Sequence, residues 1–125
     1  ATLPSSVMLG LLVRVVCDEC AEVWEPPAAL LATAGLAGAQ GCSFRRGRGC
    51  RACRGTGFKG RTAVFEVMEV TDRVRDALSR SAPSGEIRRL AVEDGMRTLR
   101  SNAARKVCSG ATTPGEIMAV TMGLE

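Results

Sequence analysis

The chain has 125 residues and a formal charge of only +4, with 17 Lys and Arg against 13 Asp and Glu. It contains six cysteines and no histidine, which excludes histidine-based catalysis and leaves thiols as its characteristic chemistry. Because it has three Phe, one Trp and no Tyr, we expect no large apolar core, and the cysteines are predicted to provide a metal site or disulfides that stabilise the fold.

The first element is an apolar run over residues 7–16. It is too short to span a bilayer and contains Arg14, and no signal peptide precedes it, so we expect the reducing cytosol. In that compartment cysteine pairs hold metal more often than they form disulfides. Periodicity alone does not decide between a helix and a buried strand for this run. A short helix is predicted over 28–34, ending at Gly35, and a loop over 38–49.

The segment from Arg61 to Val70 is rich in Val and Phe and is predicted to be a strand. Its alternate residues face opposite sides of the sheet. One face is predicted to hold Ala63, Phe65 and Val67, and the other Val64, Glu66 and Met68.

Short amphipathic helices follow the strand. The first is predicted to be capped by Thr71 or Asp72, and the second to be capped by Ser84 and to stop at Gly95. A third opens at Thr98 and closes at Gly110, with an apolar face of Leu99, Ala103 and Val107. The apolar faces of the first two are predicted to be Val74, Ala77 and Leu78, and then Ile87, Leu90 and Ala91.

The last helix has the clearest start, with Thr113 as its cap, Pro114 at its first position and Glu116 completing a capping box. Together the elements predict an α+β fold, in which a small metal-stapled module with a short β element precedes a bundle of short helices.

Four cysteines form two C-x-x-C pairs, Cys17 with Cys20 and Cys50 with Cys53, separated by 29 residues. Two residues between thiolates allow a tight turn that presents both sulfurs to one ion, and two such turns supply a closed tetrahedral shell that suits zinc. We therefore predict that these four residues bind a structural Zn²⁺, with disulfides or buried free thiols as the alternatives. Gly55 and Gly57 fit a sharp turn that points N–H groups at sulfur.

Cys42 and Cys108 have no C-x-x-C partner. They are predicted to be small unpaired thiols. Cys42 is close enough in sequence to Cys50 to serve as a spare ligand.

Seven cations without an intervening acid surround the second cysteine pair. They are Arg45, Arg46, Arg48, Arg51, Arg54, Lys59 and Arg61. Four thiolates around Zn²⁺ leave a charge of −2, which these cations would offset while donating hydrogen bonds to sulfur. Because only Phe44 and Phe58 are available for base stacking, we favour a charge-balancing or partner-facing surface over nucleic-acid binding.

Residues 55–62 read G-x-x-x-x-G-R-T, which is close to a phosphate-binding loop. Arg61 replaces the lysine, a cysteine turn precedes the loop, and a strand follows it where a helix is needed, so we reject nucleotide binding here. The acidic residues Glu66, Glu69, Glu93 and Asp94 are predicted to be solvated charges or helix caps. We therefore expect no catalysis by this chain alone.

In order along the chain, "LPSSV", "VRVVCDEC", "RGRGCRACRGTGFKGRTAVFEVMEV" and "LAVEDGMRTLRSNAARKVCSGATTPGEIMAVT" resemble the C-terminal end of the type II secretion and type IV pilus assembly ATPases. The resemblance covers nearly the whole chain. It implies that residues 1–16 are the tail of an ATPase core, 17–70 a tetracysteine zinc-binding module and 71–125 a helical subdomain.

The resemblance also implies a parent protein that binds ATP and Mg²⁺ through upstream segments. This parent would form a homo-hexamer at the cytoplasmic face of the inner membrane and engage membrane-embedded platform proteins. The tetracysteine element is typical of the assembly branches and argues against a retraction motor. Two alternatives remain: a stand-alone zinc-binding adaptor that uses its basic surface against acidic protein or nucleic acid, and a thiol-redox protein with an exposed C-x-x-C of low pKa.

Overall fold

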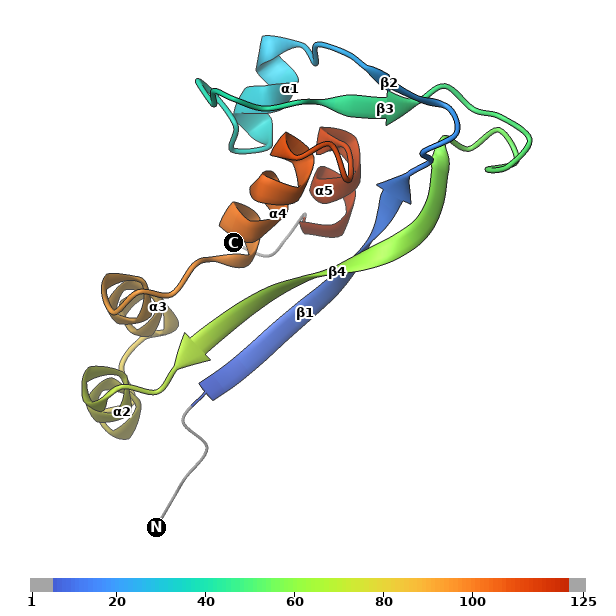
Figure 1. Ribbon diagram of the computed structural model, residues 1–125. Coiled ribbons are helices and arrows are strands. Elements are labelled where there is room, and N and C mark those ends of the chain that lie inside the picture. Colours follow the sequence, from blue (N-terminus) through green and yellow to red (C-terminus); the bar gives the residue numbers. More distant parts are fainter. Residues whose placement is uncertain (1–5, 122–125) are drawn as a thin grey trace. The chain divides into compact units, whose positions relative to one another are not determined.

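The computed structural model describes residues 6–121, and within that range the fold is α+β, as predicted. The strands are β1 (Ser6–Val16), β2 (Ala21–Val23), β3 (Arg45–Gly47) and β4 (Phe58–Glu69). The helices are α1 (Ala28–Thr33), α2 (Asp72–Ser79), α3 (Ser84–Glu93), α4 (Leu99–Cys108) and α5 (Pro114–Thr121). β1 pairs with β4, and β2 with β3, in two separate two-stranded sheets (Figure 1). None of the helices described is long and apolar enough to cross a lipid bilayer.

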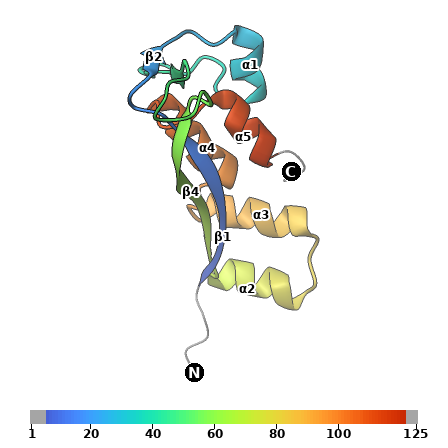
Figure 2. The ribbon, with the colours of Figure 1, turned by 90° about the vertical axis from the view of Figure 1, so that its right-hand side faces the viewer.

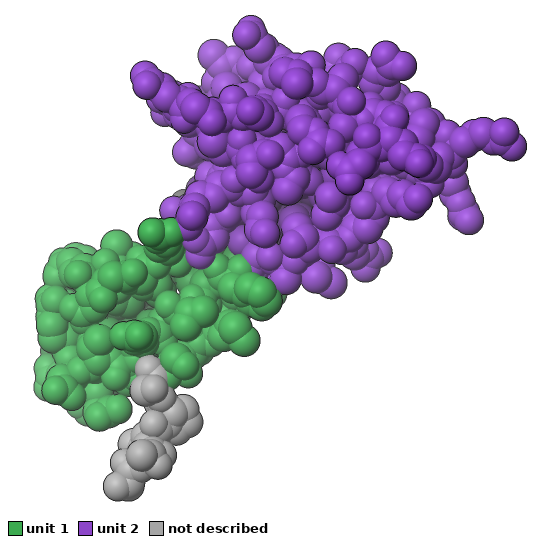
Figure 3. Space-filling view, in the orientation of Figure 1, with its two compact units in different colours: residues 1–10, 65–99 green, residues 11–64, 100–125 purple. Residues whose placement is uncertain are grey.

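The chain divides into two compact units (Figure 3). Unit 1 contains residues 65–99 and the described part of 1–10, and unit 2 contains residues 11–64 and the described part of 100–125. Strands β1 and β4 each continue from one unit into the other. All six cysteines belong to unit 2.

Strand β1 resolves the alternative that periodicity left open for residues 7–16. This run is rich in β-branched valine, which favours extended backbone, and it pairs with β4 running in the opposite direction (Figure 1). β4 begins at Phe58, three residues before the predicted start. The predicted alternation along β4 is confirmed, since Val64 is buried whereas Phe65 and Val67 on the other face are exposed.

The sheet of β2 and β3 is a short antiparallel pair that the sequence did not reveal, so the prediction of a continuous loop over 38–49 is wrong. Glu22 lies opposite Arg46, whose guanidinium donates to the Glu22 carboxylate at 3.0 Å and sits 4.8 Å from the centre of the Trp24 ring. Strands of three residues are too short to show a period of two. Contacts between partners 24 residues apart specify them instead.

Unit 1 is built around α2 and α3, which pack against each other (Figure 2). Its core consists of Val74, Ala77, Leu90 and Ala91. Thr71 caps α2 as predicted, because its hydroxyl accepts the N–H of Val74 at 3.2 Å. Two details differ from prediction. Leu78 is 47% exposed because Ala77 takes the core position of that turn, and Pro83 occupies the cap position of α3 instead of Ser84.

The helices α4 and α5 follow. α4 buries the predicted stripe of Leu99, Ala103 and Val107. Thr113 caps α5 as predicted, with its hydroxyl accepting the N–H of Glu116 at 3.2 Å. The second half of the predicted capping box is wrong, since the Glu116 carboxylate accepts hydrogen bonds from Arg14 of β1 and does not turn back to the cap.

Candidate metal centre

Two tight turns of unit 2 bring the four C-x-x-C cysteines together. Cys17 directly follows β1 and Cys20 directly precedes β2, while Cys50 and Cys53 belong to the turn that leads into β4. The second turn is closed by a hydrogen bond from the Gly55 N–H to the Cys50 carbonyl at 2.8 Å. A further bond, from the Cys17 N–H to the Gly57 carbonyl at 2.9 Å, joins the two turns.

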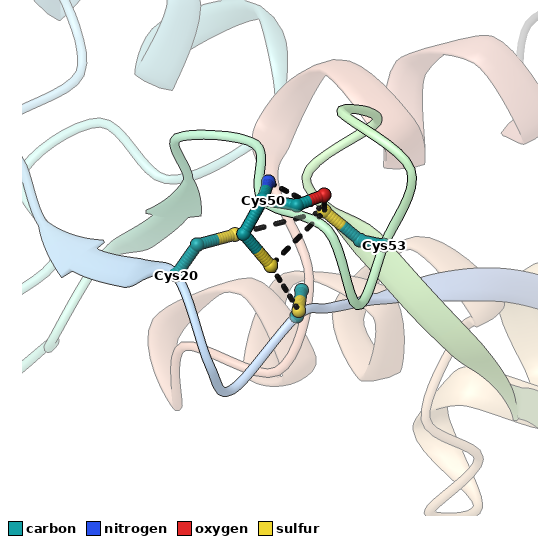
Figure 4. Close-up of side chains that lie close together, drawn as sticks. Cys20, Cys50 and Cys53 are labelled. Atoms are coloured by element: carbon teal, nitrogen blue, oxygen red, sulfur yellow. Dashed lines mark hydrogen bonds between the residues drawn. The ribbon is translucent and has the colours of Figure 1, made fainter.

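The sulfur–sulfur distances fit coordination of a single ion. Sγ of Cys17 is 3.8 Å from that of Cys50, Cys20 is 3.8 Å from Cys53, and Cys50 is 3.7 Å from Cys53. The four sulfurs all lie within 4.8 Å of one another. Figure 4 shows how the side chains of Cys20, Cys50 and Cys53 lie close together. A tetrahedron with zinc–sulfur bonds of about 2.3 Å has edges of about 3.8 Å. The cluster could therefore hold a metal ion of this size with little rearrangement.

Main-chain N–H groups point at the sulfurs. Gly49 donates to Cys20 at 3.3 Å, and the N–H groups of Cys50 and Gly57 both donate to Cys53 at 3.2 Å. Such hydrogen bonds stabilise thiolate, the form that binds metal. The prediction that a glycine of this turn aims its N–H at sulfur is confirmed for Gly57.

Gly57 is required for two reasons. Its φ of +82° lies in the left-handed region, where a side chain is strained. A Cβ at this position would also lie 2.6 Å from the carbonyl oxygen of Gly47, so the backbone of β3 passes against the turn at a distance that only glycine permits. This close approach brings β3 beside the cysteine turn.

The thiols differ in acidity. Burial opposes ionisation of Cys53, but the N–H groups of Cys50 and Gly57 outweigh it and lower the pKa of the Cys53 thiol to about 6. Burial raises the pKa of the Cys20 thiol to about 12, although the Gly49 N–H opposes this. The main-chain N–H groups of this turn therefore favour the thiolate form of Cys53, which is the form that binds metal.

The basic residues around the cluster do not bind the sulfurs. Within residues 6–121 the hydrogen bonds to the four sulfurs from nitrogen come from the main chain, which corrects the expectation that arginines donate them. Arg45 pairs with Asp18 at 2.9 Å, and Arg46 pairs with Glu22. The side chains of Arg48, Arg51, Arg54, Lys59 and Arg61 are exposed. They form a basic surface over the cysteine turn and the start of β4.

The loop that resembles a phosphate site continues into β4 and not into a helix, as expected. Glu66 is 12% exposed and accepts the N–H of Leu99, the first residue of α4, at 2.7 Å. It therefore caps that helix from another element and is not a solvated charge. Asp94 accepts the Thr71 hydroxyl at 2.6 Å, and this bond outweighs its partial burial and lowers the pKa of the carboxyl.

The two remaining cysteines, Cys42 and Cys108, form a disulfide across 66 residues. The prediction that they are unpaired thiols, and that Cys42 is a spare ligand, is therefore wrong. The four C-x-x-C cysteines are free thiols. Nothing in the spacing of the six cysteines indicates the disulfide, because its partners are brought together by the packing of α4 against the segment before β3.

An ion pair that the sequence analysis missed supports the strand leading to Cys17. The Glu116 carboxylate, 9% exposed, accepts the Arg14 main-chain N–H at 2.9 Å and the Arg14 guanidinium at 3.0 Å. Burial opposes ionisation of Glu116, but these bonds outweigh it and lower its pKa. The same guanidinium lies 4.2 Å from the centre of the Phe58 ring at the start of β4. The partners are 102 residues apart, so no local pattern indicates them.

The fold and the site together place the protein in the class of α+β proteins in which two C-x-x-C turns bring four thiols close together. Comparison with known proteins then identifies the family. A family model described as "Type II/IV secretion system protein" matches residues 2–119, and the chain belongs to that family. This confirms the resemblance read from the sequence.

Two curated relatives are similar over nearly the whole chain. The "Type IV pilus assembly ATPase PilB" of Thermus thermophilus is 37% identical across 94% of this chain, which corresponds to 14% of that protein. The "Type II secretion system protein E" of Pseudomonas aeruginosa is 35% identical across 94% of this chain and 24% of that protein. The chain thus spans between 14% and 24% of the length of these relatives.

Proposed function

We propose that the chain is the zinc-binding C-terminal module of an ATPase that powers assembly of type IV pili or of the related secretion pseudopilus. The observation that carries this proposal is the close approach of four sulfurs, all within 4.8 Å of one another, in a chain of the secretion family. The name of one relative, which this chain matches over 14% of that relative's length, is a pilus assembly ATPase.

Zinc would be held by Cys17, Cys20, Cys50 and Cys53, and its role would be structural. Four thiolates fill a tetrahedral shell and leave no open position for water or substrate, so the ion would fix the fold of unit 2 and perform no chemistry. The shell carries a charge of −2. The exposed cations over the cysteine turn would offset part of it without contacting sulfur.

In this proposal the module packs on the ATPase core of the same protein, which supplies the sites for ATP and Mg²⁺. The parent works as a homo-hexamer at the cytoplasmic face of the inner membrane and engages the platform proteins of the machine. Support for these partners comes from the family alone, which consists of secretion-system proteins.

Metal content tests the site. The purified protein should contain about one zinc per chain by elemental analysis. Cys50→Ser should lower the content well below one, because three thiolates bind zinc far more weakly. The matched control is the double variant Cys42→Ser and Cys108→Ser, which removes two cysteines outside the cluster and should keep its zinc. A wild-type protein without zinc, or a Cys50→Ser variant that retains it fully, contradicts the proposal.

The assignment to an assembly motor needs a test in cells. The Cys50→Ser change in the full-length protein should abolish surface pili or protein secretion, while the double control variant should support them. If Cys50→Ser removes zinc but pilus formation and secretion both stay normal, the metal site stands and the role in the motor does not.

A further inference from the structure

The disulfide joins two segments that nothing else in the sequence relates. Cys42 lies in the segment between α1 and β3, and Cys108 is the last residue of α4. Both belong to unit 2, and neither is part of the four-sulfur cluster. The proposed zinc site does not include Cys42 or Cys108, so the role of this disulfide is separate from metal binding.

Main-chain contacts hold the two segments together independently of the bond. The N–H of Ser43 donates to the carbonyl of Cys108 at 2.8 Å. Gly110, with φ of +85°, lies so close that a Cβ there would meet the Ser43 carbonyl oxygen at 2.7 Å. After reduction the two thiols would therefore remain neighbours, and the bond can form again without a search through open conformations.

The disulfide is also accessible. Both cysteines are half-buried, and the residues beside them, Gly41, Ser43 and Ser109, are exposed. In the cluster, Cys17 and Cys53 are buried and Cys20 and Cys50 are half-buried, but a bound metal would occupy all four sulfurs. Cys42 and Cys108 are thus the pair open to thiol–disulfide exchange while the metal centre stays intact.

We propose that Cys42 and Cys108 are a reversible redox site that fastens the β2–β3 sheet to α4. Closing oxidises the two thiols, which lose two electrons and two protons to a disulfide of the glutathione class and reduce it to two thiols. Opening is the reverse exchange, in which a dithiol gives up two electrons and two protons and becomes a disulfide. Each direction passes through a mixed disulfide with one of the two cysteines.

The state of the disulfide can affect the four-sulfur cluster through strand β3, which connects Cys42 to residues that contact Cys20. Two residues separate Cys42 from the start of β3, and β3 leads to Arg48 and Gly49. The Arg48 N–H donates to the Cys20 carbonyl at 3.1 Å, and the Gly49 N–H donates to its sulfur. Closing the bond adds a covalent anchor to the strand that makes these contacts, and opening it leaves only the main-chain contacts to hold that strand. This second step rests on the proposed metal role of Cys20, whereas the thiol chemistry does not.

The test uses purified protein equilibrated with oxidised glutathione or with a dithiol, then alkylated without denaturant and mapped by mass spectrometry. We expect a linked Cys42–Cys108 peptide after oxidation and two alkylated thiols after reduction. Amide hydrogen exchange in residues 36–47 should become roughly tenfold faster, or more, on reduction. The double variant Cys42→Ser and Cys108→Ser should exchange quickly under both conditions.

Three results would overturn the proposal: Cys42 and Cys108 remain alkylatable after oxidation, the bond resists the dithiol until the protein is denatured, or hydrogen exchange is the same in both states. Zinc content measured on the same samples separates this inference from the proposed function. A protein that contains no zinc but closes and opens the bond refutes the metal site and leaves the redox site standing.

Discussion

Removal of the zinc ion that we propose for unit 2 is the perturbation that tests how this unit is held closed. The two cysteine pairs enclose 29 residues, which include β2, α1 and β3. These elements are three to six residues long, and strands and helices of that length are marginal in isolation. The enclosed segment therefore depends on its closure points, of which the four-sulfur cluster is one and the Cys42–Cys108 disulfide is another.

The size of the effect follows from the length of the loop. Cross-linking the ends of a loop of about 30 residues removes roughly 3.5 kcal/mol of chain entropy from the unfolded state at 25 °C. Zinc bound by a four-ligand structural site contributes about 10–16 kcal/mol to folding of small domains, which matches or exceeds the whole stability of a typical domain, about 5–15 kcal/mol. Loss of the ion should therefore unfold the segment between Cys20 and Cys50 and not merely loosen it.

The assay is amide hydrogen exchange with mass spectrometry, before and after a chelator, under reducing conditions that keep the disulfide open. We expect protection in residues 21–57 to disappear on chelation and to return with added Zn²⁺. The Cys50→Ser variant should behave as the chelated protein does, and the double variant lacking Cys42 and Cys108 should still respond to the chelator. Unchanged protection in residues 21–57 after complete metal removal would show that the reasoning about closure is wrong.

Two further predictions follow from particular contacts. Glu116→Gln should destabilise the protein by about 1–2 kcal/mol, a value reduced because Arg14 is half exposed. Folding lowers the pKa of Glu116 below its ordinary value of 4.5. The ionised carboxylate therefore stabilises the folded protein fully above the unfolded-state pKa, and this stabilisation is lost as the pH falls through the folded-state pKa. Chemical denaturation between pH 7 and 3 should show that the variant loses less stability on acidification than the wild type. Gly57→Ala should cost about 2 kcal/mol or more, because of its positive φ and the approach of Gly47, and should weaken zinc retention. The control Gly85→Ala, at a helical position with open space, should be neutral or stabilising, and equal effects of the two changes on the thermal midpoint would count against the strain argument.

Sequence reasoning succeeded where the determining interactions are local. A two-residue spacer between cysteines, a Thr one position before a helix, and the alternation along β4 are each set by neighbours within a few residues. They predicted the convergence of Cys17, Cys20, Cys50 and Cys53 on one point, the Thr71 and Thr113 caps, and the division of β4 into two opposite faces.

It failed where the partner is distant in sequence. The Cys42–Cys108 disulfide spans 66 residues, and the Arg14–Glu116 pair spans 102. Glu116 stands three positions beyond a Thr cap, where a capping box is the local expectation. The Arg14 main-chain N–H and its guanidinium provide four hydrogen bonds that outweigh the one that the box would form.

Because the chain divides into two units, we expect metal removal to affect hydrogen exchange in α5 but not in α2 and α3. α2 and α3 bury Val74 and Ala77 in a core that contains no cysteine, so they should keep their protection when the metal is removed. α5 belongs to unit 2, and the turn before it is bound to the strand that delivers Cys17: the Val16 N–H donates to the Ala111 carbonyl at 2.9 Å, and the Thr112 hydroxyl donates to the Arg14 carbonyl at 2.8 Å. If the backbone at Cys17 becomes disordered, these hydrogen bonds to the turn before α5 should weaken, and the start of α5 should become less protected. Metal removal should speed exchange at the start of α5 while leaving α2 unchanged, and equal responses in the two helices would show that the units do not unfold separately.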